Sequence, residues 1–155
     1  MKVKDRSFRQ PMGAGQIKIA EVARAAVDGF QPTICIVYLY GSRATGTDNE
    51  ESDFDFAVAA DRPLSFGERR GLASRFVEGI EESSSSVDVD VVDLRAIPLT
   101  LAAQILEYGV VLIGEAHTER GFLETRLMSQ YALLNEERHE VIEAIVARGS
   151  VFART

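Results

Sequence analysis

The chain has 155 residues, a length that fits one domain able to bury most of its apolar surface without disulfides or a structural metal. Its composition is 46% hydrophobic and 26% charged, which is close to the globular average and excludes a disordered chain or a fibrous repeat. The formal net charge is −7, the wrong sign for a protein that binds nucleic acid mainly through phosphates. Nucleic acid is therefore not expected as the partner.

No segment predicts contact with a membrane. The longest apolar run, residues 33–40, is far shorter than the roughly 20 residues that cross a bilayer. The first residues are basic but lack the apolar core of a secretory signal. A single cysteine, Cys35, permits no disulfide within one chain. These features predict a cytoplasmic protein.

The first half of the chain predicts a helix and two strands. Apolar residues recur at helical spacing over residues 16–28. Residues 33–40 are rich in β-branched and aromatic side chains without alternation, which predicts a strand covered on both faces. A polar loop over residues 41–52 leads to DFDFAVA, which starts at Asp53 and alternates. We expect this second strand to run antiparallel to the first.

A second helix and a third strand follow. Residues 65–68, Ser-Phe-Gly-Glu, have the spacing of a capping box and predict the start of a helix that runs to about Ile80. Residues 87–92 read VDVDVV, and this alternation predicts a strand with Asp88 and Asp90 on one face.

The last part of the chain predicts a short helix, a short strand and a long helical segment. Pro98 suits the first turn of a helix that runs to about Tyr108, and residues 110–113 form an apolar strand. Residues 117–148 have a helical pattern, which Asn135 is expected to divide into two helices.

The order of these elements predicts the fold class. No internal repeat or shift in composition marks a boundary, so residues 1–155 are expected to form a single domain, with residues 116–149 as a helical C-terminal tail. Helices and strands mix in an order that favours an α+β fold, in which a small mixed sheet has helices packed on one side.

The segment between the first two strands carries the most distinctive residues. Gly41 lets the backbone turn tightly and approach a ligand, and Ser42 adds a hydroxyl beside exposed backbone N–H groups, so the turn can hold phosphate oxygens. Asp53 and Asp55 alternate on one strand face, where their carboxylates repel each other unless a cation lies between them. Such hard oxygen ligands suit Mg²⁺ or Mn²⁺.

A third carboxylate would complete this site. Asp90 or Asp88 could supply it if the third strand lies beside the second. Two metal ions, about 3.5 to 4 Å apart, could then bridge a triphosphate and a nucleophile.

The pattern resembles the minimal nucleotidyltransferases of the polymerase-β-like superfamily, especially the antitoxins encoded with HEPN-domain toxins. Their motif is Gly-Ser, ten residues and Asp-x-Asp, which residues 41–55 match residue for residue. Their third carboxylate opens a segment of the form Asp-Val-Val-Asp-Leu, which is residues 90–94 here, so the resemblance selects Asp90 over Asp88. The similarity continues through QILEYGVVLIGE, residues 104–115, into the tail.

The resemblance implies a polymerase-β-like fold and an enzymatic function. By resemblance, Gly41 and Ser42 bind the triphosphate of ATP, while Asp53, Asp55 and Asp90 hold two Mg²⁺ ions. Asp90 also helps to deprotonate the attacking hydroxyl. AMP would pass to a tyrosine of a HEPN ribonuclease toxin. The protein would then be a protein adenylyltransferase and an antitoxin. It could also form an oligomer with the toxin.

Some alternatives stay open. Arg43 could bind a phosphate, or it could pair with Asp48 or Glu50 in its own loop. A nucleotidyltransferase for a small molecule, such as an aminoglycoside, would need walls around that substrate, and only the tail after Gly114 could build them. A non-catalytic antitoxin that neutralises its toxin by binding is the third alternative.

Overall fold

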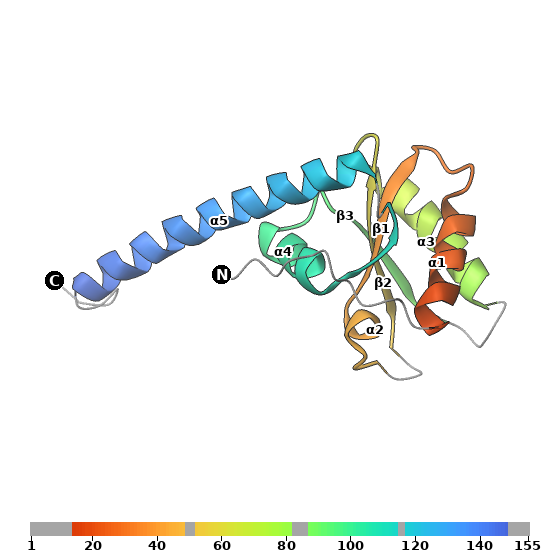
Figure 1. Cartoon of the computed structure of the whole chain (residues 1–155), viewed down its shortest axis with the longest axis horizontal. Helices are drawn as coiled ribbons and strands as arrows, with labels where there is room; N and C mark the ends of the chain where they lie inside the picture. The colour runs from red at the N-terminus through yellow and green to blue at the C-terminus, as the bar shows by residue number, and fades with distance from the viewer. Residues whose placement is uncertain (1–13, 49–51, 82–86, 115–116, 149–155) are drawn as a thin grey trace.

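The computed structural model describes residues 14–48, 52–81, 87–114 and 117–148. A central sheet carries helices on both sides, and a long helix projects from it (Figure 1). The elements in chain order are α1 (Ala14–Val27), β1 (Ile34–Tyr40), α2 (Ser42–Thr45), β2 (Phe54–Ala60), α3 (Phe66–Glu81), β3 (Val89–Asp93), α4 (Leu99–Tyr108), β4 (Val110–Ile113) and α5 (Thr118–Ala147).

The sheet is mixed, as the sequence predicts, with strand order β3-β2-β1-β4. β1 runs antiparallel to both β2 and β4, whereas β2 and β3 are parallel. The predicted antiparallel pairing of the first two strands is therefore confirmed. The third strand lies beside the second, which was the condition for a third carboxylate at the site.

Both faces of the sheet are covered. On one face α1 and α3 pack against a cluster that includes Val37 and Phe56, and the Phe56 ring stacks on Phe76 with 4.0 Å between centroids. On the other face α4 and the first turns of α5 cover Ile36 and Tyr38. The α+β class is confirmed, but the expectation of helices on one side describes only α1 and α3. Because β1 is apolar on both faces, each face needs its own cover.

The predicted capping box at the start of α3 is confirmed. The Ser65 N–H donates to Glu68 Oε2 at 2.8 Å, and the Glu68 N–H donates to Ser65 Oγ at 3.1 Å. These reciprocal bonds satisfy N–H groups that have no partner within the helix itself.

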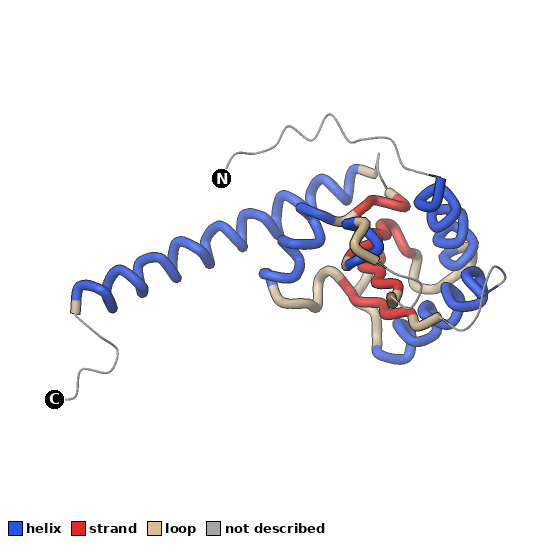
Figure 2. The backbone as a smooth tube through the Cα atoms, turned by 90° about the horizontal axis from the view of Figure 1, so that it is seen from below, coloured by secondary structure: helices blue, strands red, loops and turns tan. Residues whose placement is uncertain are grey.

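α5 is one continuous helix of 30 residues, so the expected division at Asn135 is wrong. A single asparagine lowers helix stability by only a fraction of a kcal/mol, and no proline interrupts the segment. The buried residues of α5 are Leu123, Glu124 and Leu127, all in its first turns. The rest of the helix extends away from the sheet (Figure 2). No helix in the described ranges, α5 included, combines the length and apolarity needed to span a membrane.

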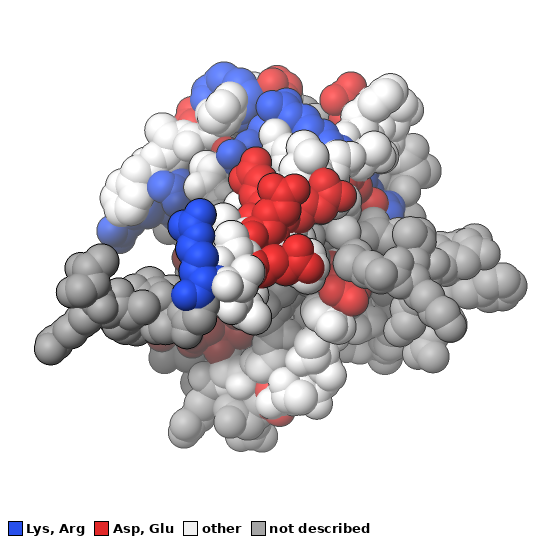
Figure 3. Space-filling model, turned by 90° about the vertical axis from the view of Figure 1, so that its left-hand side faces the viewer, with Lys and Arg blue, Asp and Glu red and all other residues white. Residues whose placement is uncertain are grey.

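The projecting part of α5 mixes charge with apolar surface. Figure 3, in which the projecting end of α5 faces the viewer, shows acidic side chains gathered near the centre of that face. Large apolar side chains are also exposed there, namely Leu133, Val141, Ile142 and Val146.

Candidate active site

Three side chains lie in a row across β1, β2 and β3, at one end of these strands. Tyr40, the last residue of β1, is the cross-strand partner of Asp55 in β2, and Asp55 is in turn the partner of Asp90 in β3. Cross-strand partners project on the same face of a sheet. This face is the one that α4 and α5 cover, because Ala57, two residues after Asp55, packs in their cluster.

Asp55 is the electrostatic centre of this row. Partial burial raises its pKa above the ordinary value, and the carboxylates of Asp90 and Asp53 raise it further. Burial, together with Asp55 and Asp90, also raises the pKa of Tyr40 to about 12. Asp53 and Asp90 are exposed at the rim. The predicted repulsion among these carboxylates is therefore present, and a bound cation would relieve it.

The carboxylates do not form a closed metal cage. Within the residues that the structure describes, no three histidine, cysteine, aspartate or glutamate side chains are grouped closely enough to hold a metal ion. The kind and number of these ligands still fit a hard divalent cation.

Gly41 brings the backbone of the turn against Asp55. Its φ is +74°, in the left-handed region that favours glycine. A Cβ at this position would overlap with Asp55 Oδ2. The glycine of the Gly-Ser motif thus has two physical reasons to be glycine, and the turn packs directly against the Asp55 carboxylate.

The loop that follows contains the short helix α2, which the sequence analysis did not predict. Arg43 ties this loop together: its Nε and Nη2 donate to the Ser52 carbonyl at 3.0 and 2.7 Å, and its Nη1 contacts Asp48 at 3.3 Å. The guanidinium also lies 3.9 Å from the centroid of the Phe54 ring. Of the two alternatives for Arg43, pairing with Asp48 is the one observed; Glu50 lies outside the described residues, and a phosphate contact stays a prediction.

The register of β3 on β2 places Asp90, rather than Asp88, beside Asp55. Asp90 lies within β3 beside Asp55, whereas Asp88 precedes the strand. The Asp88 carbonyl accepts a hydrogen bond from the Phe54 N–H at 2.9 Å, so Asp88 contributes its backbone to the start of the pairing.

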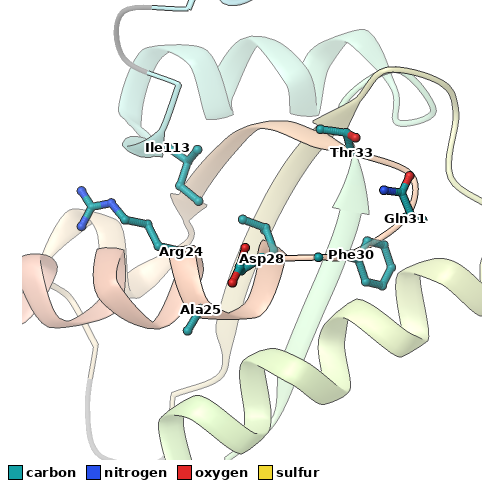
Figure 4. A pocket seen from close by; sticks show the side chains of 9 residues that line it. Arg24, Ala25, Asp28, Phe30, Gln31, Thr33 and Ile113 are labelled. Carbon is teal, nitrogen blue, oxygen red and sulfur yellow. The ribbon is translucent and has the colours of Figure 1, made fainter.

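A cavity of about 380 Å³ adjoins the Gly41-Ser42 turn and opens between α2 and α4. The α4 residues that line it were not singled out in the sequence analysis. Three of them, Gln104, Ile105 and Tyr108, lie in the segment QILEYG, residues 104–109, which belongs to the stretch that resembles the family. A second, more open hollow lies at the other end of β1 (Figure 4) and contains none of the predicted site residues; it is lined by Arg24, Asp28, Phe30, Gln31, Thr33 and Ile113 among others.

Comparison with known proteins agrees with this geometry. Residues 27–118, which include every predicted site residue, match the family model described as polymerase beta, nucleotidyltransferase. The chain belongs to this nucleotidyltransferase family. The protein adenylyltransferase MntA of Shewanella oneidensis is 32% identical over 116 residues, which are 75% of this chain and 79% of that protein.

Solved structures extend the likeness over more of the chain. A chain of a toxin–antitoxin structure with AMP-PNP matches with a TM-score of 0.66 and 29% identity, over 84% of this chain and 98% of its own. A chain from a structure of the tri-AMPylated Shewanella oneidensis HEPN toxin in complex with MNT antitoxin matches with a TM-score of 0.64 and 25% identity, over the same shares. The predicted resemblance to the minimal nucleotidyltransferase antitoxins is confirmed.

Proposed function

We propose that the protein transfers AMP from ATP to a hydroxyl group of a HEPN-type toxin, a tyrosine by analogy, and thereby acts as its antitoxin. The observation that carries this proposal is the row of Asp55 and Asp90 beside the Gly41 turn. The names of the similar proteins support the direction of transfer, because one is a protein adenylyltransferase and another is found with an AMPylated toxin.

Each residue of the site has a role in this reaction. The backbone and hydroxyl of Gly41-Ser42 would hold the phosphates, as such glycine turns do. Asp53, Asp55 and Asp90 would hold two Mg²⁺ ions. When bound, these ions would neutralise phosphate charge and favour the ionised form of the attacking hydroxyl.

The bond changes in the proposed transfer are simple. The acceptor oxygen attacks the α-phosphorus, the bond from that phosphorus to the bridging oxygen breaks, and pyrophosphate leaves. Asp90 is exposed, so it can reach a hydroxyl presented by another protein and accept its proton. Catalysis rests on positioning and charge rather than on a covalent enzyme intermediate. The need for ATP supports a cytoplasmic reaction.

The shape of the molecule favours a protein acceptor over a small molecule. The tail after Gly114 was the one segment expected to build walls around a small substrate. Beyond Leu127 no described residue of α5 is buried, and the helix projects away from the sheet (Figure 1). The exposed apolar side chains of the projecting part suit contact with a protein.

We propose that residues 1–155 form one nucleotidyltransferase domain with residues 116–149 as its tail.

The test is a transfer assay with a purified HEPN-domain toxin, for which the product of the gene neighbouring this one is the first candidate to express. After incubation with ATP and Mg²⁺, intact mass spectrometry is expected to show gains of one or more AMP units on the toxin, with loss of its ribonuclease activity. Asp55→Asn is expected to abolish both changes, whereas the matched control Asp88→Asn retains them. Neutralisation of the toxin without any gain in mass, unaffected by Asp55→Asn, would favour the non-catalytic alternative and overturn the proposal.

A further inference from the structure

The cavity between α2 and α4 has the surface expected of a nucleobase site. It holds about 380 Å³ and shares Gly41 and Ser42 with the turn assigned to the phosphates. Pockets for small ligands are mostly apolar, with a few polar groups that fix orientation. A nucleoside triphosphate is the ligand that would need a phosphate turn and an apolar pocket side by side.

One face of α4 forms the far wall of this cavity. Leu101, Gln104, Ile105 and Tyr108 all line it, and their spacing of three, four and seven residues places them on a single helix face. Ile105 is buried against the sheet, whereas Tyr108 is 61% exposed. A large aromatic ring that borders a cavity and remains open to solvent is suited to stacking on a flat base.

Tyr40 forms the wall on the side of the sheet and links the cavity to the carboxylates. It lines the cavity and is also the cross-strand partner of Asp55. Tyr40 therefore borders both the carboxylates and the cavity that α4 walls on its far side. For a nucleotide whose α-phosphate lies at the carboxylates, this cavity is the apolar space next to Tyr40 that its base could enter.

The polar groups in the lining differ in what they can offer to a base. The hydroxyls of Thr45 and Thr47 are hydrogen-bonded to each other at 3.0 Å, and Thr45 Oγ1 also donates to the Gly41 carbonyl at 3.4 Å. Both hydroxyls therefore already have hydrogen-bond partners within the loop. Gln104 is exposed and carries an amide that both donates and accepts hydrogen bonds. Such an amide can pair with the edge of a purine.

From this arrangement we infer that the cavity binds the purine base of the nucleotide donor, with Tyr108 stacking on the base and Gln104 contacting its polar edge. The inference rests on the proposed function and goes beyond it, since it names the residues that recognise the base. It does not involve the acceptor protein.

The test separates the base from the phosphates by comparing two ligands. Binding of ATP and of inorganic tripolyphosphate, each with Mg²⁺, is measured by calorimetry. The full chain is expected to bind ATP more tightly than tripolyphosphate, and Tyr108→Ala is expected to weaken ATP binding on the order of ten-fold while leaving tripolyphosphate unchanged. Glu107→Ala, beside Tyr108 but outside the cavity lining, is the matched control and should change neither.

Purine riboside triphosphate, which lacks the exocyclic amino group of ATP, tests Gln104. The starting protein is expected to prefer ATP to this analogue, and Gln104→Ala should remove the preference. An unchanged preference would overturn the role of Gln104. Equal effects of Tyr108→Ala on ATP and tripolyphosphate, or equal affinity of the starting protein for both, would overturn the cavity as the base site. Failure of both ligands to bind would instead count against the phosphate turn, and so against the proposed function.

Discussion

Asp55 and Asp90 are direct partners across the parallel pair of β2 and β3, which brings two carboxylates side by side on a partly buried sheet face. The pKa of Asp55 is raised by burial, by Asp90 and by Asp53. Unfavourable charge of this kind is a common feature of functional sites, because a ligand of opposite charge then gains from relieving it.

Replacing Asp55 by asparagine removes one of the repelling charges without a large change in shape. In the presence of a chelator, Asp55→Asn is expected to unfold at a higher temperature than the starting protein. The same variant should lose the stabilisation that ATP and Mg²⁺ confer, since a ligand that binds the native state raises the midpoint temperature of thermal unfolding. Thermal unfolding with and without these ligands checks both expectations. Equal ligand-induced shifts in the variant and the starting protein would contradict the site.

The raised pKa of Asp55 also predicts a pH dependence in the metal-free protein. The native state keeps this proton to a higher pH than the unfolded chain, so stability falls as the pH rises from the ordinary value of 3.8 through the raised pKa. Above the raised pKa, Asp55 is ionised in the native state and the full loss of stability is present. Urea unfolding from about pH 4 to about pH 8 should therefore show the stability advantage of Asp55→Asn growing with pH and then levelling. If the stability advantage of Asp55→Asn shrinks as the pH rises, the pKa of Asp55 is lowered rather than raised in the native state.

Gly41 and Gly46 differ in backbone conformation and in surroundings. Gly41, with ψ of −158°, lies in a region open essentially to glycine alone, whereas Gly46, with ψ of 19°, lies in the ordinary left-handed region. Both have a positive φ, of 74° and 76°, but a Cβ at Gly41 would meet Asp55 whereas the space around Gly46 is open. Gly46→Ala is expected to lower the free energy of unfolding by about 1 to 2 kcal/mol through strain alone. Gly41→Ala should lower it further, because the backbone of Gly41 is in a region open essentially to glycine alone, and it should also abolish AMP transfer, because Asp55 must move.

Both glycine variants are measured by urea unfolding and by the transfer assay. Gly46→Ala should retain transfer if it is assayed at a temperature where it is folded. Retention of full transfer by Gly41→Ala would contradict the close fit between the turn and Asp55.

Strand periodicity was enough to propose Asp53 and Asp55 as candidate site residues, but the third carboxylate and the arrangement of all three depended on strand pairing. Alternation put Asp53 and Asp55 on one face from local sequence alone. The family motif, rather than the alternation, selected Asp90 over Asp88. The structure supplies the reason, since the parallel register of β3 on β2 sets Asp90 and not Asp88 beside Asp55. Register between strands distant in the chain cannot be read from either strand by itself.

The features that the sequence analysis missed are tertiary. The apolar run of residues 33–40 indicated that its strand is covered on both faces, but identifying the cover of the second face requires knowing that α4 and α5 return to β1, which no local pattern states. Asn135 does not divide α5 as predicted, because asparagine, although favoured at helix starts, lowers helix stability only slightly inside a long helix. The cavity beside Gly41 could not be predicted either, since α4 forms its wall from residues about sixty positions further along the chain.

A buried polar contact helps to attach α5 to the sheet. The Tyr38 hydroxyl donates to Glu124 Oε1, and Arg120 Nε donates to the same oxygen at 2.8 Å. The side chains of Arg120 and Glu124 are only 12% and 11% exposed. Glu124→Ala is expected to lower the free energy of unfolding by about 3 kcal/mol, because removing one member of a buried pair leaves desolvated polar groups behind.

The same helix provides the control for this change. His139 and Glu143 form an i, i+4 pair at 3.1 Å, but their side chains are 73% and 68% exposed. Glu143→Ala is therefore expected to change stability by no more than about 0.5 kcal/mol. Urea unfolding of both variants measures the difference. Equal losses would mean that the buried contact with Tyr38 adds nothing to the docking of α5, and that the apolar contacts of Leu123 and Leu127 hold the helix alone.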